Sequence, residues 1–538
     1  MKDIHLVKSL KDILTKKNEN IKFTIILSIL IYFSSIFSTN IFYLKSSIMS
    51  NTKEFLILSI IDFILNFLCL LLFSFINKFC VYLYTIFIFI LNSINYWTIT
   101  ITNKRFLITD LLLTKTVVNN LKEVHLSLYS IFYFILLLLI YMLIIKFIKK
   151  NIYHKTNIQY KIFFVGLIFI MIIEMFSYFY SNSSIKYRVE IKPYLYSNIF
   201  YNLEEFEYLK KPNDYNEHLN KIKELQNKEK ISENTSSPII IQIMSEALMD
   251  FDNINYMPFT KSLESGKVQT NIWGNKTVVS EFESLTGIST NTLKINSANP
   301  YTLIKNKNID SIISTAKNNG YKTIGIHPYL GKSYQRNKYW NYLGFDEMYF
   351  IENFNNPTYV RNYISDESFF DKIIETIHKN ENTPLYIYGI SMQNHATFTN
   401  EDFKNTINVG TDELNQYVSL ENITDKSFEN FIKKLENENR EVILLYYGDH
   451  QPMLSDTSYK NLNVSDKYEV PYVLWSNKKN LTCPNKIQMC QLPLLLLKNS
   501  NLSLSGWFNY LNELEKTDDD FINNSLYKSW CYYQLKNI

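Results

Sequence analysis

The sequence predicts a two-part protein, an N-terminal transmembrane domain of five helices followed by an extracellular α/β domain with a largely parallel central sheet. The first observation is a series of apolar runs, each approaching the about 20 residues that a helix needs to cross a bilayer. The second is a change of pattern after residue 238, where short apolar segments alternate with helical ones. The third is charge. Residues 1–181 hold 18 Lys and Arg against 8 Asp and Glu, a balance of +10, whereas the remaining 37 and 43 give −6.

The composition narrows the classes of protein to which the chain can belong. Its 538 residues exceed one ordinary domain, and a net charge of +4 argues against a dedicated nucleic-acid binder. None of the five cysteines belongs to a C-x-x-C pair, so neither a disulfide scaffold nor a zinc ribbon is expected. The spacing of Cys483 and Cys490 permits a disulfide, although two free thiols fit the sequence equally well.

Five apolar runs predict membrane-spanning helices. Lysines gather before the first run and, with no acid among them, between the fourth and the fifth. The positive-inside rule therefore places the N-terminus in the cytoplasm, and an odd number of crossings places everything after Tyr180 outside the cell. The runs cover residues 23–44, 55–76, 79–98, 126–145 and 162–180.

Two acids, Asp62 and Glu174, lie inside these runs, where an ionised side chain is costly. They could form a lipid-headgroup site or a proton path. An interhelical hydrogen bond with the acid protonated is the interpretation we favour. A transporter function is not favoured, because most of the sequence lies outside the predicted membrane domain.

A polar segment rich in Lys, Glu and Asn, residues 182–237, follows the last apolar run. Leu203, Phe206 and Leu209 recur at a spacing of three, which is typical of a helix. The segment ends in a turn-like stretch before Pro238. We therefore expect three parts: a transmembrane domain over 1–181, a helical linker over 182–237 and an extracellular α/β domain over 238–538.

The third part alternates short apolar strands with helical stretches, a pattern that predicts a mostly parallel sheet covered by helices on both faces. In such sheets ligands bind beyond the carboxyl ends of the strands. The predicted strands are 239–244, 322–326, 385–390, 442–447 and 470–475. The clearest helical patterns are 309–319, 368–379 and 427–436.

Polar side chains suited to a metal or a phosphate follow four of these strands. Glu246 follows the first, His327 the second, His395 the third, and Asp449 with His450 the fourth. Because the carboxyl ends of parallel strands lie at one edge of a sheet, we expect these side chains to form a site there.

Thr277 begins a helix-like segment between the first two strands. A threonine in that place can be a helix cap, and it can also be a nucleophile, because a helix N-terminus attracts phosphate. A threonine hydroxyl is weakly acidic, so a nearby divalent cation is needed to favour its alkoxide. Glu246, Asp449 and His450 have the mixed oxygen and nitrogen donors for such a cation.

These residues lie in a series of motifs between residues 239 and 477. The series resembles the lipoteichoic acid synthase and phosphoglycerol transferase family of the alkaline phosphatase/sulfatase superfamily, whose layout of five membrane spans, linker and sulfatase-like outer domain also matches. The motifs are Ile243-Met-Ser-Glu-Ala-Leu-Met-Asp250, Thr277-x-x-x-Glu281-Phe-Glu-x-Leu-Thr-Gly287, Ile326-His-Pro-Tyr329, Gly344-Phe-Asp346, Met392-Gln-Asn-His395 and Tyr447-Gly-Asp-His-Gln-Pro452.

The resemblance implies that Thr277 is both nucleophile and metal ligand, and that Glu246, Asp449 and His450 complete a site for one divalent cation. That cation is expected to be manganese, with magnesium and zinc as alternatives. Arg336 and His395 match the substrate-phosphate contacts of the family, with His327 near them. The sequence departs from the family at Lys276, where glycine is usual, and at Tyr334-Gln335, where Trp-Asn often precedes the arginine.

The function implied is transfer of phosphoglycerol from phosphatidylglycerol through a Thr277-linked intermediate. The acceptor would be a polyglycerolphosphate chain of a cell-wall polymer or a glycan. His395 could act as acid or base. Phosphoethanolamine transfer and a non-catalytic, membrane-anchored binding protein are the alternatives. Sulfatase chemistry is not expected, because no cysteine or serine stands in a C-x-P-x-R context.

Overall fold

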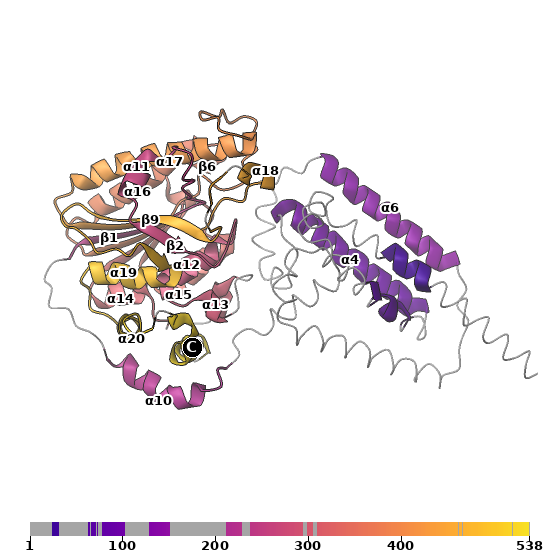
Figure 1. Cartoon of the computed structure of the whole chain (residues 1–538), viewed down its shortest axis with the longest axis horizontal. Coiled ribbons are helices and arrows are strands. Elements are labelled where there is room, and N and C mark those ends of the chain that lie inside the picture. Colours follow the sequence, from indigo (N-terminus) through magenta and orange to yellow (C-terminus); the bar gives the residue numbers. More distant parts are fainter. Residues whose placement is uncertain are drawn as a thin grey trace, which may run out of the picture. The chain divides into compact units, whose positions relative to one another are not determined.

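The computed structural model describes residues 24–31, 63–64, 66–71, 73, 78–102, 128–150, 211–228, 237–293, 299–304, 309–460, 462–464, 466–518 and 520–536 (Figure 1). The chain divides into two units, Met1–Glu207 and Tyr208–Ile538. Each unit has its own apolar core, so we describe them separately.

The first unit contains two long helices, α4 (Lys78–Thr102) and α6 (Leu128–Lys150), which cover most of the third and fourth predicted runs. They pack on each other, and the Asn92 amide donates a 2.8 Å hydrogen bond to the Tyr141 hydroxyl between them. A search of the described residues finds no helix with the combination of length and apolar character that crossing a membrane requires. The fifth predicted run, Asp62 and Glu174 lie outside the described residues, as do parts of the first two runs.

The second unit is built on an eight-stranded sheet of order β10-β2-β9-β8-β1-β7-β3-β4. Strands β8, β1, β7, β3 and β4 are parallel neighbours, whereas β9 runs antiparallel to both β8 and β2. The sheet is therefore mostly parallel, as predicted. The strands are β1 (Ile239–Ser245), β2 (Gly266–Gln269), β3 (Lys322–Ile326), β4 (Glu347–Tyr349), β7 (Leu385–Ile390), β8 (Val442–Gly448), β9 (Glu469–Ser476) and β10 (Lys486–Gln488).

The central strand β1 is buried along its whole length, because helices cover both faces of the sheet. Ile239, Ile241 and Ile243 face one core, while Ile240 and Met244 face the other. This two-sided burial explains why the strand is a continuous apolar run rather than an alternating one.

One layer of helices packs against each face of the sheet (Figure 1). The first layer contains α11 (Pro258–Leu263), α16 (Asp366–Lys379) and α17 (Asp412–Glu436). The second contains α12 (Thr277–Thr286), α14 (Ile312–Asn318), α15 (Arg336–Leu343), α19 (Leu492–Asn499), α20 (Gly506–Leu514) and α21 (Ser525–Lys536).

Shorter elements connect these layers. A separate hairpin is formed by β5 (Tyr359–Val360) and β6 (Tyr363–Ile364). The remaining pieces are α13 (Thr290–Leu293), α18 (Asp456–Tyr459), η4 (Pro300–Leu303), η5 (Ser333–Gln335), η6 (Ile351–Asn353), η7 (Met489–Gln491) and η8 (Phe521–Asn523).

All five predicted strands are present, and the main difference concerns α17. The prediction starts this helix at residue 427, whereas it begins at Asp412, after Thr411, whose side chain accepts a hydrogen bond from Leu414 N. Its first half buries Asn415, Gln416 and Ser419. These buried polar residues interrupt the apolar periodicity on which the prediction depends.

Part of the segment predicted as a linker packs on the second unit. Helix α10 (Tyr215–Gln226) lies against α20 and α21, with Ile222 fully buried. His218 Nδ1 lies 2.9 Å from Ser529 Oγ, and the Asn509 amide donates to the Lys228 carbonyl over 3.0 Å. This stretch of the predicted linker therefore packs into the core of the second unit.

The five cysteines are all free thiols. Cys483 is exposed, while Cys490 and Cys531 are buried. Of the two arrangements open for Cys483 and Cys490, the structure has the unbridged one.

Candidate metal and phosphate site

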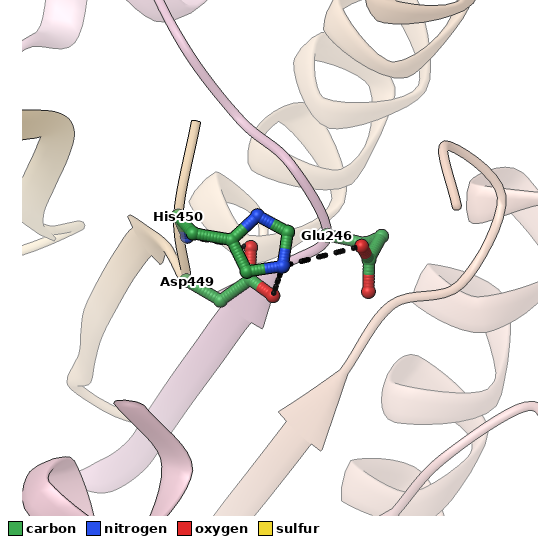
Figure 2. A group of neighbouring side chains, drawn as sticks. All are labelled: Glu246, Asp449 and His450. Atoms are coloured by element: carbon green, nitrogen blue, oxygen red, sulfur yellow. Dashed lines mark hydrogen bonds and ion pairs between the residues drawn. The ribbon is translucent and has the colours of Figure 1, made fainter. Parts of the chain in front are cut away.

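Three residues predicted as metal ligands converge at the carboxyl ends of β1 and β8. Glu246 follows β1 directly, and Asp449 and His450 follow β8. One ligand atom from each lies within 4.8 Å of the others, and all three side chains are buried. Figure 2 shows the His450 ring turned toward both carboxylates, with Nε2 3.1 Å from Asp449 Oδ2 and 3.8 Å from Glu246 Oε1. The strand ends thus assemble the predicted donor set.

Backbone and side-chain hydrogen bonds orient each of these groups. Asp449 Oδ1 accepts 2.8 Å hydrogen bonds from the backbone N–H groups of Ala247 and His450, which directs Oδ2 inward. His450 Nδ1 lies 2.9 Å from the Gln451 carbonyl. A carbonyl can only accept, so Nδ1 carries the proton and Nε2 offers its lone pair to the site. Metal-binding histidines are commonly held in this way.

The electrostatics of the cluster fit a divalent cation. Burial, and then the neighbouring Asp449 carboxylate, raises the pKa of Glu246 from 4.5 to about 8. Asp449 Oδ2 is buried and has no hydrogen-bond donor. Two carboxylates and an imidazole are a donor set that Mn²⁺, Zn²⁺ or Mg²⁺ can use, and such an ion would offset the repulsion between the acids.

Thr277 is the first residue of α12, and its hydroxyl lies 3.4 Å from Glu246 Oε2. The preceding residue, Lys276, has φ 71°, a left-handed conformation that turns the chain sharply into the helix. Helix N-termini favour anions because their first N–H groups have no helical partner. The structure therefore places Thr277 beside Glu246, one of the predicted metal ligands, and at the N-terminus of a helix.

Arg336 is buried, with 3% exposure, and its guanidinium is held by two residues. Its Nε donates to Glu281 Oε2 over 2.9 Å, and Nη1 lies 3.1 Å from His327 Nε2. The His327 Nδ1 proton is donated to the Ile390 carbonyl over 3.1 Å, so Nε2 accepts from the arginine. Burial, followed by the Arg336 charge, lowers the pKa of His327 well below its usual value. His327 is thus a neutral residue that orients Arg336.

Glu281 is a further residue of this site, to which the sequence analysis assigned no role. It is completely buried, and Oε1 accepts hydrogen bonds from Trp340 Nε1 at 2.6 Å and from the Tyr301 hydroxyl at 2.9 Å. Its position in the sequence motif that begins at Thr277 could have indicated a role in the site. It lies four positions after Thr277, which puts both on one face of α12.

Tyr334 is the second residue with an unassigned role. Its ring lies 5.2 Å from the Arg336 guanidinium, and burial raises its pKa to about 12, with the charges of Glu246 and Asp449 contributing. Tyr334 and Gln335 both have positive φ, 49° and 57°. Consecutive strained residues of this kind are frequent at functional sites. They stand where the resemblance expects Trp-Asn, and the substitution preserves an aromatic ring beside the arginine.

His395 lies on the loop after β7. Its ring packs against Tyr363, with centroids 5.6 Å apart, and Nδ1 lies 2.8 Å from the Ala396 carbonyl. Its charge still contributes to lowering the pKa of His327. The predicted site therefore has three parts at the same edge of the sheet. They are the candidate metal ligands, the group around Arg336, and the loop that carries His395.

Residues 238–491 match the Sulfatase family. A Rhizobium meliloti (strain 1021) protein provisionally assigned to cyclic beta-1,2-glucan modification is 29% identical over 270 residues. The match covers 45% of this chain and 42% of that protein, so the chain spans about two fifths of the length of this relative.

Two solved structures share the fold. The Streptococcus pyogenes phosphoglycerol transferase GacH, in complex with sn-glycerol-1-phosphate, is 21% identical with a TM-score of 0.51, covering 61% of this chain and 94% of that chain. The integral membrane protein lipooligosaccharide phosphoethanolamine transferase A (EptA) from Neisseria meningitidis is 13% identical with a TM-score of 0.53, covering 88% of this chain and 96% of that chain.

Proposed function

Because residues 238–491 form a sulfatase-like domain, we propose that the chain is a metal-dependent transferase anchored in the cell membrane. It moves phosphoglycerol from phosphatidylglycerol to a glycerolphosphate polymer or a glycan. The observation that carries this proposal is the Thr277 hydroxyl at the N-terminus of α12, 3.4 Å from a proposed metal ligand. Glu246, Asp449, His450 and Thr277 would hold the cation, which supplies positive charge that favours the Thr277 alkoxide and polarises the phosphate.

The reaction proceeds in two displacements at phosphorus. Thr277 Oγ1, its proton released to solvent, bonds to phosphorus, and the bond to the diacylglycerol oxygen breaks as that oxygen takes a proton from His395. The acceptor hydroxyl then gives its proton to His395 and attacks phosphorus. The bond to Thr277 breaks, and its oxygen regains a proton from solvent. Splitting the transfer in this way is typical of nucleophilic catalysis.

Arg336 binds the phosphate of the donor. Glu281 and His327 occupy its Nε and Nη1 groups, so Nη2 is the donor that an anionic oxygen would meet. Charge-assisted hydrogen bonds of this type are stronger than neutral ones. The buried Glu281 also fixes the direction of the guanidinium before substrate arrives, which reduces the entropy lost on binding.

The test uses full-length protein in detergent with fluorescent phosphatidylglycerol and Mn²⁺. Wild type should release diacylglycerol, and Thr277→Ala should not. Thr376→Ala is the matched control, because Thr376 is a buried threonine on α16 whose hydroxyl donates to the Lys372 carbonyl. Equal release by wild type and Thr277→Ala, or no release by wild type, would refute the mechanism.

Phosphoethanolamine transfer is the second candidate, favoured by the likeness to EptA over 88% of this chain. Running fluorescent phosphatidylethanolamine in parallel separates the two donors. Faster turnover of phosphatidylethanolamine would replace phosphoglycerol in the proposal while leaving Thr277 as nucleophile. A protein that binds both lipids and turns over neither would be the non-catalytic alternative.

The membrane anchor is also part of the proposal. Five apolar runs and the placement of lysines support it, and helix α4 carries exposed apolar side chains along one face. Phe79, Leu83, Phe87 and Ile90 are 63%, 51%, 51% and 49% exposed, at spacings of three and four. Such a stripe would be costly in water and is suited to lipid.

The exposed Cys483 provides a test of orientation. A membrane-impermeant maleimide should label wild type in intact cells, and Cys483→Ser should lose that labelling. Labelling that requires cell lysis would place the catalytic unit inside and overturn the predicted topology.

A further inference from the structure

The loop that carries His395 is held by an arginine to which the proposed mechanism gives no role. Arg361 lies between β5 and β6 and has φ 54°, an unusual conformation for a residue with a side chain. Its Nη1 donates to the Thr397 carbonyl over 2.7 Å. Its Nη2 donates to the carbonyls of Gln393 and His395 over 2.7 and 2.8 Å. One guanidinium therefore ties together three carbonyls of a five-residue stretch.

The other side of this loop is fastened to the helix layer. Gln393 Oε1 accepts from Asp366 N over 3.0 Å, at the start of α16. The side-chain amides of Gln393 and Asn394 donate to Thr424 Oγ1 over 3.1 and 2.9 Å, and Thr424 in turn donates to Asp366 Oδ2 over 2.6 Å. The residues before His395 are thus anchored in the core, whereas the backbone carbonyls of His395 and Thr397 accept hydrogen bonds from Arg361 of the hairpin.

The same hairpin contacts the imidazole itself. Tyr363, two residues after Arg361, packs against the His395 ring, and its hydroxyl oxygen lies 3.3 Å from Nδ1. Nδ1 donates to the Ala396 carbonyl, so Nε2 is the nitrogen that can accept a proton. Any shift of the 395–397 backbone would move both the ring and the carbonyl that selects its tautomer.

We propose that Arg361 is a positioning residue, whose contribution to transfer is to hold His395 in the orientation needed for proton transfer. The inference rests on the proposed function of His395. The planar fork of arginine is needed, because the three carbonyls are met by Nη1 and Nη2 in fixed directions, which a lysine ammonium does not match. The positive φ of Arg361 is a strained conformation for a residue with a side chain, and strained residues are frequent at functional sites.

Arg440 is a matched control for this idea. It also donates to three backbone carbonyls, those of Asn380, Glu381 and Thr383, at 3.3, 3.0 and 2.9 Å. It lies two residues before β8, at the opposite end of the strands from the site. Arg440→Gln therefore removes a similar set of hydrogen bonds without touching the His395 loop.

The test compares Arg361→Gln, Arg361→Lys and Arg440→Gln in the full-length protein. Arg361→Gln should lower kcat by roughly 10- to 100-fold, as expected for a displaced catalytic group, and change the donor KM by less than about threefold. Arg361→Lys should recover little of the loss, and Arg440→Gln should keep kcat within about threefold of wild type. In a His395→Ala background, Arg361→Gln should have no further effect on kcat, since its effect passes through His395. Additive losses would overturn the proposal.

A second measurement does not depend on activity. Amide hydrogen exchange of peptides covering 392–400 should be faster in Arg361→Gln than in wild type and unchanged in Arg440→Gln. If wild type transfers no phosphoglycerol but amide exchange behaves as expected, the proposed function is wrong. The structural part of the inference, that Arg361 holds the His395 loop, is then still supported. If amide exchange over 392–400 is unchanged in Arg361→Gln, the proposal that Arg361 holds the His395 loop is refuted, whatever the activity of the variant.

Discussion

Replacing Glu281 by glutamine tests the role of the buried ion pair between Glu281 and Arg336. Glu281 and Arg336 form an ion pair of 2.9 Å with exposures of 0% and 3%. A glutamine of the same shape can still accept from Trp340 and Tyr301, but it no longer carries the charge that offsets the guanidinium. Arg336 would then be a buried cation without a counter-charge. Removing one member of a buried pair costs about 3–5 kcal/mol.

This loss converts into a measurable thermal shift. Unfolding entropy of about 2.1 cal/mol/K per residue makes about 0.7 kcal/mol/K for the unit Tyr208–Ile538, so its thermal midpoint should fall by about 4–7 °C. The assay is thermal unfolding of the full-length protein at pH 6, with and without inorganic phosphate. Phosphate should stabilise Glu281→Gln more than wild type, because an anion can take the place of the lost carboxylate beside Arg336.

Glu283→Gln is the matched control, two residues further along the same helix. Glu283 is also buried, but its Oε1 accepts from neutral donors, Asn271 Nδ2 and the N–H and hydroxyl of Thr290. At pH 6 this substitution should raise the midpoint by up to about 3 °C rather than lower it, because the neutral amide removes the cost of protonating Glu283 on folding. Equal shifts for the two variants, or no shift for Glu281→Gln, would refute the reasoning about the unpaired arginine.

Three further outcomes are expected. Burial raises the pKa of Glu283 from 4.5 to about 7, so its contribution to stability is complete below pH 4.5 and falls by about 3 kcal/mol as the pH rises to 8. Glu283→Gln should remove that part of the pH dependence in denaturant titrations, and an unchanged slope would contradict it. In Gly506→Ala, the new Cβ would lie 2.4 Å from the Leu225 carbonyl oxygen and 2.6 Å from Gln226 Cα. The clash should cost about 1–3 kcal/mol and speed amide exchange over 215–226, whereas protected amides there would show that α10 can adjust. Lys276→Gly relieves a left-handed residue and should raise stability by about 1 kcal/mol. A lower thermal midpoint would mean that the Lys276 side chain stabilises the loop before Thr277.

Several features of the second unit could be predicted from the sequence because their signals are local. The five strands are short, β-branched apolar runs, and their order along the chain with intervening helices indicates a mostly parallel sheet. Parallel strands bring their carboxyl ends to one edge. The meeting of Glu246, Asp449 and His450 therefore followed from topology alone, although 203 positions separate the first two. The first unit is different. The described helices α4 and α6 coincide with two apolar runs, while five membrane crossings stay a prediction.

The sequence by itself determined five of the eight strands of the sheet, the edge at which the candidate site lies and the candidate donor set for a cation, because apolar periodicity and strand direction are properties of short segments. The tertiary structure alone decided how those side chains are held. It paired Arg336 with Glu281, made His327 a neutral partner of that arginine, and placed Arg361 against the His395 loop. It also docked α10 on α20 and α21. Each of these is a hydrogen bond or packing contact between distant parts of the chain, and its geometry depends on the completed core around it.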